Sequence, residues 1–146
     1  MINNGNGGYL ETDYTSLEFF YHGGASGDFD NDGDLDVLVT DAGRGKSAIF
    51  VNYNGVFNPT TQLINKKLME GMYNAEFYDI NKDGFLDIIS GGHDWTYGNV
   101  NTPLIIFGDG IDYINGQTLR LPESYINGQG IVTDFNFYDL DGDNIE

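Results

Sequence analysis

Residues 28–36 read Asp-Phe-Asp-Asn-Asp-Gly-Asp-Leu-Asp, which places five carboxylates at alternate positions around one glycine. So many like charges repel one another unless a cation lies between them. Side chains at alternate positions of a tight loop can turn inward together, and Ca²⁺ takes about six to eight oxygen ligands in proteins. Gly33 would supply the left-handed turn that folds the loop around the ion. The stretch therefore predicts a calcium-binding loop.

The same spacing recurs at residues 79–87, with oxygen side chains at positions 1, 3, 5 and 9 and glycine at position 6. Position 7 is Asp34 in the first copy but Phe85 in the second, so the expected ligand at Phe85 is its backbone carbonyl. A third copy begins at residue 139 and matches at positions 1, 3 and 5, with Asn144 in place of the glycine. Asn tolerates the left-handed conformation, so this copy remains a candidate.

Each of the three loops contributes its own set of expected calcium ligands. The sets are Asp28, Asp30, Asp32, Asp34 and Asp36 in the first loop, Asp79, Asn81, Asp83, Phe85 and Asp87 in the second, and Asp139, Asp141 and Asp143 in the third. Eleven of the 23 acidic residues of the chain are aspartates of these loops. Bound calcium would therefore offset much of the formal net charge of −17.

Position 12 separates two calcium architectures that begin with this spacing. An EF-hand loop needs a bidentate carboxylate at that position and a helix on each side, whereas this chain has Val39 and Ser90 there. Residues 36–40 and 87–90 are rich in apolar and β-branched residues, which favours a strand after each loop. The EF-hand interpretation is therefore disfavoured.

Residues 27–37 resemble the calcium hairpin of FG-GAP/VCBS repeats, the blade unit of integrin-α-like β-propellers, in which the loop joins the first two strands of a blade. Residues 50–57, Phe-Val-Asn-Tyr-Asn-Gly-Val-Phe, resemble a later strand and turn of the same family, and residues 2–9 resemble the end of an earlier blade. The resemblance implies an all-β fold: β-propeller blades of four antiparallel strands with calcium-binding hairpin loops, in an incomplete propeller.

The repeat period supports this organisation. The loops start at residues 28, 79 and 139, and self-similarity at that spacing predicts a propeller or a solenoid. A closed propeller needs about four to eight blades, so we expect part of one β-propeller domain from a longer protein, packed against neighbouring blades of the same parent chain. The expected divisions are the end of a blade at 1–16, repeat 1 at 17–62, repeat 2 at 73–121 and the start of repeat 3 at 129–146.

Short strands are expected throughout the two whole repeats. They run through residues 19–21 and at 36–40, 48–52, 56–61, 75–78, 87–90, 103–107 and 118–121. The only helical candidate is residues 63–72, where the apolar residues are irregularly spaced and Gly71 interrupts the pattern.

Charge and composition narrow the partners. A strongly acidic chain cannot neutralise phosphates, which argues against nucleic acid and against an anionic membrane surface. There is no cysteine, and no apolar run approaches the roughly 20 residues of a membrane span, so membrane insertion is not expected. Weak calcium sites stay filled where calcium is high, which favours an extracellular or cell-surface location.

Residues 91–99 form the most distinctive stretch outside the calcium loops, because they include the only Trp of the chain. His93, Trp95 and Tyr97 are candidate glycan contacts, since aromatic faces beside polar groups suit sugar rings. The alternative is that Trp95 only packs against a blade. His22, before the first loop, is expected to be a strand-end or inter-blade hydrogen-bonding residue.

No catalytic set assembles in the sequence. Cysteine is absent, there is no Gly-x-Ser-x-Gly elbow, and neither His has a zinc-helix context. The leading interpretation is a calcium-binding β-propeller segment of an extracellular or cell-surface protein that serves as a binding or adhesion scaffold for glycan or protein, not an enzyme. The alternatives are the propeller of a secreted polysaccharide-degrading lyase or hydrolase, and a purely structural repeat array.

Overall fold

The structure is a computed structural model of the chain. It describes residues 2–3, 6, 9–10, 21–42, 47–92, 103–122 and 132–139.

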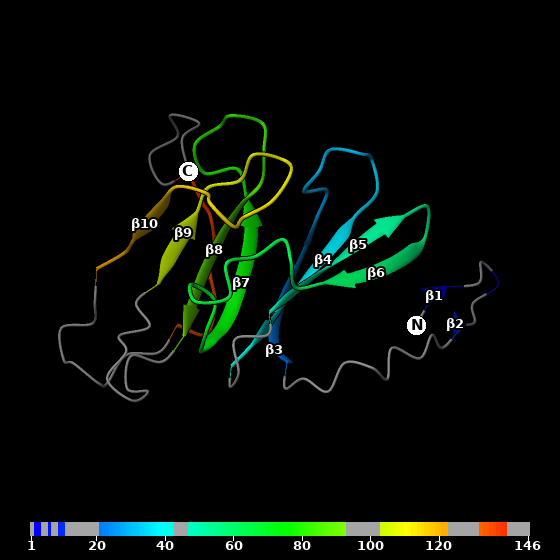
Figure 1. The fold of residues 1–146 in the computed structure, drawn as a ribbon, viewed down its shortest axis with the longest axis horizontal. Helices are drawn as coiled ribbons and strands as arrows, with labels where there is room; N and C mark the ends of the chain where they lie inside the picture. Colours follow the sequence, from blue (N-terminus) through cyan, green and yellow to red (C-terminus); the bar gives the residue numbers. More distant parts are fainter. Residues whose placement is uncertain are drawn as a thin grey trace.

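The described residues form two four-stranded antiparallel sheets and one short hairpin (Figure 1). The first sheet contains β3 (Tyr21–Gly27), β4 (Asp36–Asp41), β5 (Ala48–Tyr53) and β6 (Val56–Thr60), in that order. The second contains β7 (Met72–Tyr78), β8 (Asp87–Gly92), β9 (Leu104–Ile106) and β10 (Thr118–Arg120). The hairpin pairs β1 (Ile2–Asn3) with β2 (Tyr9–Leu10).

Each large sheet is a meander of consecutive strands, which is the construction of a propeller blade, and the two sheets do not close into a ring. The prediction of an all-β fold with four-stranded antiparallel blades in an incomplete propeller is confirmed. Strands β4 to β10 lie where the sequence predicts them, with ends that differ by up to three residues. Strand β3 continues to Gly27 and so runs directly into the first loop.

The helix considered at residues 63–72 is not formed. The amides of Leu68 and Met69 both donate to the carbonyl of Asn65, at 3.0 and 3.3 Å, which makes one turn only. Ile64 and Met69 are buried, and Ile64 forms a β-bridge with Tyr113. The irregular apolar residues of this stretch therefore fill the core from a loop.

The two sheets also share their internal register. Gly23 pairs with Thr40 in the first sheet, and Asn74 pairs with Gly91 in the second, 51 residues further along both strands. A β-bulge precedes each of these pairs. The spacing of 51 residues between the first two loops therefore also separates equivalent backbone positions in the two sheets.

Strand β7 packs against β3, and small residues on β3 permit the approach. A Cβ atom at Gly23 would lie 2.5 Å from the carbonyl oxygen of Tyr73, so only glycine fits there. The ring of His22 packs on that of Tyr73 with 4.5 Å between centroids, which places His22 between the blades. The fully buried side chains around this interface include Leu38, Ile49, Met69, Met72, Ile88, Leu104, Ile106 and Tyr113.

Residues 132–139 run along the second sheet. The amide of Val132 donates to the carbonyl of Gly92 at 3.3 Å. The side-chain amide of Asn74 donates to the carbonyl of Thr133 at 3.0 Å. This segment therefore packs on β7 and β8, much as β7 itself packs on the first sheet.

Candidate metal centres

The two complete aspartate loops lie at the same edge of the molecule, at the top of Figure 1. Residues 28–35 connect β3 to β4, and residues 79–86 connect β7 to β8. We refer to these segments, each with the aspartate that opens the following strand, as loop 1 and loop 2. Each loop thus joins the first two strands of its sheet.

The backbones of the two loops turn in the same way. Gly33 and Gly84, at position 6, have φ angles of 95° and 91°, so the predicted left-handed turn is confirmed at both. Position 4 is also left-handed, with φ 59° at both Asn31 and Lys82. Asn adopts this conformation more readily than most residues, whereas at Lys82 it costs roughly 1–2 kcal/mol.

The aspartate at position 1 holds each turn from inside. One oxygen of Asp28 accepts from the amide of Asp32 and the other from the amide of Gly33, each at 3.0 Å. The carboxylate of Asp79 accepts from Asp83 at 3.0 Å and from Gly84 at 2.9 Å. These bonds wrap the loop around its first carboxylate.

The aspartate at position 9 is fully buried in both loops and connects three segments of the blade. Asp36 accepts from the amide of Phe29 at 3.1 Å and from the amide of Asn52, in β5, at 2.8 Å. Asp87 accepts from Ile80 and from Gly108, both at 2.9 Å. Burial raises the pKa of both carboxyls above the usual range, although these amides act in the opposite direction.

Loop 1 brings three predicted ligands together. Carboxylate oxygens of Asp28, Asp30 and Asp36 all lie within 4.8 Å of one another. Because Ca²⁺ binds oxygen at about 2.3–2.6 Å, two oxygens on one ion lie up to about 5 Å apart, so this group fits a single calcium ion. Burial, and then the nearby charge of Asp32, raise the pKa of Asp30. A divalent cation would relieve this crowding of negative charge.

The other two aspartates of loop 1 make backbone contacts. Asp32 accepts from the amide of Asp34 at 2.9 Å. Asp34 accepts from the amide of Asn54 at 2.7 Å and so caps the turn between β5 and β6. The structure thus gives the Asp34 side chain a structural partner, which leaves the backbone carbonyl as the natural donor at position 7.

Loop 2 keeps the frame with fewer charges. Asn81 replaces an aspartate at position 3, and its amide nitrogen donates to Asp83 at 2.8 Å. Asp83 in turn accepts from the amide of Phe85 at 2.9 Å, as its counterpart does in loop 1. The ring of Phe85 lies over Gly110, where a Cβ atom would be 2.7 Å from the ring. Loop 2 therefore offers fewer charged groups to a cation than loop 1.

The carbonyl at position 8 has a different donor in each repeat. The side-chain amide of Asn52 donates to the carbonyl of Leu35 at 3.1 Å. In the second repeat Gly108 occupies the equivalent place, and the hydroxyl of Tyr113 donates to the carbonyl of Leu86 at 2.7 Å. In the sequence, Asn52 stands out only as part of a family-like motif, and no pattern marks Tyr113.

The two loops also touch each other. The side-chain amide of Asn31 in loop 1 donates to the carbonyl of Gly84 in loop 2 at 3.2 Å. The ring of Tyr113 lies 6.1 Å from that of Phe29 and 6.2 Å from that of Phe77. Residues of both repeats thus surround one buried tyrosine.

Several predicted site residues lie outside the described part of the chain. These are Asp141 and Asp143 of the third loop, and the candidate glycan contacts His93, Trp95 and Tyr97. Asp139 is described and follows the segment that packs on β7. The third calcium loop and the glycan contacts stay predictions.

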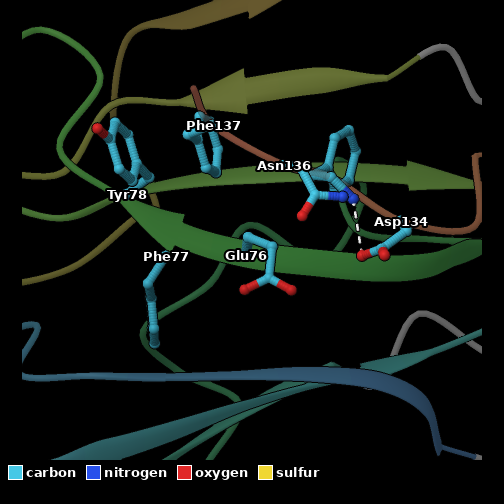
Figure 2. Close-up of a pocket in the computed structure, with 7 residues that line it drawn as sticks. Glu76, Phe77, Tyr78, Asp134, Asn136 and Phe137 are labelled. Atoms are coloured by element: carbon cyan, nitrogen blue, oxygen red, sulfur yellow. Dashed lines mark hydrogen bonds between the residues drawn. The ribbon is translucent and has the colours of Figure 1, made fainter. Parts of the chain in front are cut away.

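A separate hollow lies between β7 and residues 134–137, with a volume of about 440 Å³. Figure 2 shows Tyr78 and Phe137 side by side at one end, and their rings stack at 3.9 Å. Burial, and then the charge of Asp134, raise the pKa of Glu76 in its wall. This hollow was not predicted, and it lies between β7 of the second sheet and the extended segment 134–137.

Comparisons with known proteins agree with this geometry. The family model of the FG-GAP-like repeat matches residues 28–90, from the start of loop 1 into β8. No curated protein and no solved structure gave a significant match. In the part of the chain that the structure describes, no helix is long and apolar enough to cross a membrane.

Proposed function

Because residues 28–90 form an FG-GAP-like repeat, we propose that this chain is a calcium-stabilised segment of an extracellular or cell-surface β-propeller. It serves as a binding or adhesion scaffold for a glycan or protein ligand. The observation that supports calcium most directly is the convergence of Asp28, Asp30 and Asp36 within 4.8 Å. The family supports the location, since FG-GAP repeats are typical of extracellular proteins.

Calcium would have a structural role in these loops. The position 9 aspartates open the second strand of each blade and accept amides from the loop and from the third strand or the residues just after it, and burial makes their charge costly. An ion held by Asp28, Asp30 and Asp36 would compensate that charge and hold the hairpin closed. A blade edge kept rigid in this way can present its remaining loops to a ligand.

Thermal unfolding tests the calcium proposal. The full chain is unfolded in EDTA and across a calcium titration, with magnesium as the ionic control. Binding to the native state predicts a midpoint that rises with calcium concentration, by the equivalent of about 2.7 kcal/mol at roughly 100 times the dissociation constant. Equal midpoints in EDTA and saturating calcium would contradict the proposal.

A pair of variants locates the effect. Asp30→Asn removes one charge from the converging group, whereas Glu70→Gln makes the same charge change at an exposed residue that belongs to neither loop. We expect Asp30→Asn to weaken the calcium-dependent stabilisation and Glu70→Gln to leave it intact. Equal losses in the two variants would indicate a general effect of surface charge.

The ligand is tested separately, by a glycan array with the calcium-loaded chain. Trp95→Ala is the comparison, because Trp95 is the central candidate among His93, Trp95 and Tyr97. A glycan that binds the native chain and not this variant would support the carbohydrate ligand. Binding unaffected by Trp95→Ala would move the contact elsewhere, and the absence of glycan binding would favour a protein ligand.

A further inference from the structure

We propose that loop 1 and loop 2 bind calcium cooperatively, because loop 1 supplies part of the support that holds the backbone of loop 2. The inference rests on the proposed calcium function and adds a coupling between the two sites. It concerns Asn31 and Phe29 of loop 1, and Tyr113, which lies between the loops. None of these three side chains is among the expected metal ligands.

The first link is the hydrogen bond from Asn31. The amide of Gly84 is held within its own loop by Asp79, at 2.9 Å, while its carbonyl is held by Asn31 of loop 1, at 3.2 Å. Loop 1 therefore restrains the peptide unit that leads from Gly84 into Phe85. The carbonyl of Phe85, the next along the chain, is the expected backbone ligand of loop 2.

The second link runs through Tyr113. Its hydroxyl holds the carbonyl of Leu86 at 2.7 Å, and its ring packs on the buried ring of Phe29. The amide of Phe29 donates to Asp36, one of the converging carboxylates of loop 1. A short chain of contacts thus joins a candidate ligand of loop 1 to the carbonyl that follows Phe85.

Together the two links hold the carbonyls on both sides of the Phe85 carbonyl. An ion in loop 1 would order Asn31 and Phe29, and loop 2 would then lose less conformational entropy when it binds its own ion. The coupling must be reciprocal, so an ion in loop 2 favours loop 1 by the same factor. Calcium bound in loop 1 also neutralises negative charge, which weakens the attraction of loop 2 for a second ion and so opposes the cooperativity. Salt at about 0.15 M screens this electrostatic effect beyond roughly 8 Å.

The experiment follows each loop separately in the full chain. Amide NMR signals of Gly33 and Gly84 report loop 1 and loop 2, since each amide donates to the first aspartate of its own loop. Calcium is titrated at about 0.15 M salt into the native chain and into Asp30→Asn, which removes a candidate ligand of loop 1 and none of loop 2. Cooperativity predicts that Asp30→Asn raises the calcium midpoint at Gly84 by about fivefold or more.

A second set of variants removes the links without removing a ligand. Asn31→Gly deletes the donor and keeps the left-handed backbone, and Asn54→Gly makes the same change at a residue with φ 52° in the turn between β5 and β6. Tyr113→Phe deletes only the hydroxyl. We expect Asn31→Gly to raise the midpoint at Gly84 severalfold and to reduce the further effect of Asp30→Asn, with Asn54→Gly unchanged and Tyr113→Phe intermediate.

The outcomes separate the two proposals. If both glycine signals respond to calcium in the native chain but Asp30→Asn leaves the midpoint at Gly84 unchanged, the sites are independent and the cooperativity is wrong. If Asp30→Asn shifts that midpoint equally with and without the Asn31 side chain, the proposed link through Asn31 is wrong. If neither signal responds to calcium, the calcium function fails and the coupling fails with it.

Discussion

Loop 1 and loop 2 adopt one backbone conformation with different side chains. The shared part is a set of backbone amides that donate to the carboxylates at positions 1, 5 and 9 and to the side-chain oxygen at position 3. The loops differ at position 7, which is Asp34 in loop 1 and Phe85 in loop 2. They also differ in the side chain that donates to the carbonyl at position 8. The frame therefore depends on acceptors for backbone amides, while the side chains around it can be exchanged.

The largest effect is expected from the two buried aspartates. Asp36→Ala and Asp87→Ala each leave two backbone amides without their acceptor, and one buried unsatisfied donor costs about 1–3 kcal/mol. Each variant should therefore lose about 2–4 kcal/mol of unfolding free energy in EDTA, before any loss of calcium binding. Urea unfolding in EDTA measures this. A loss confined to one of the two variants would show that the loops do not share a frame.

The next largest loss of stability is expected from changes to the groups that hold the position 8 carbonyl. Asn52→Gly removes the donor to Leu35 and the acceptor of the Gly55 amide, so we expect a loss of about 1–2 kcal/mol. Gly108→Asn makes the repeats more alike in sequence, yet it should also destabilise, because a Cβ atom there overlaps the Leu86 carbonyl and lies 3.0 Å from the Tyr113 ring. Thermal unfolding compares both variants. If Gly108→Asn stabilised the chain, this would contradict the conclusion that Tyr113 has in the second repeat the role that Asn52 has in the first.

Position 7 sharpens the contrast in charge. Phe85→Asp adds a carboxylate to loop 2 and should increase its calcium affinity by roughly fivefold, which corresponds to about 1 kcal/mol for one added charge near the ion. The midpoint of the Gly84 amide signal in a calcium titration measures the change, with the Gly33 signal as the internal control. An unchanged midpoint would mean that position 7 contributes nothing beyond its carbonyl.

The smallest expected effect is on pH dependence. Burial raises the pKa of Asp36 and Asp87 in the fold above that of the unfolded chain, so their protonation favours folding as pH falls toward the raised pKa. The same protons compete with calcium. The difference between the unfolding midpoints in calcium and in EDTA should therefore narrow as the pH falls toward the raised pKa of these carboxyls.

The two loops should differ in this response. The pKa of Asp30 is also raised, whereas loop 2 has the non-titrating Asn81 at that position. The calcium midpoint at Gly33 should accordingly shift more with acidification than the midpoint at Gly84. Identical shifts at the two glycines would show that Asp30 does not carry the difference.

The sequence predicted the features that depend on local chemistry. Alternating carboxylates and Gly33 predicted the loop, and the β-branched residues after Asp36 and Asp87 predicted the strands that follow. The features that it missed depend on contacts across the fold. Nothing local to Tyr113 indicates that its hydroxyl meets Leu86, 27 residues earlier.

The failed helix at residues 63–72 has a similar cause. Ile64 and Met69 are apolar because they reach a core made by other strands, so their spacing follows the shape of that core and no helical period. The bond from Asn31 to Gly84 was equally hidden. Nothing in the pattern of residues 28–36 indicates a partner for the Asn31 side chain, and that partner is a backbone group.

The hydrogen bond from Asn31 to the carbonyl of Gly84 affects how the number of repeats in such a chain can change. Its acceptor is a main-chain carbonyl, which every residue possesses, so the joint does not depend on the side chain that the following blade presents. A unit that is duplicated, deleted or exchanged still offers the acceptor, provided that its own loop turns left-handed at the sixth position. The donor and the acceptor belong to successive units, so a series of units joined by this bond has a direction. Tandem duplication of a unit that has Asn at the fourth position, as loop 1 does and loop 2 with Lys82 does not, can therefore change the number of units while the bond between them stays the same.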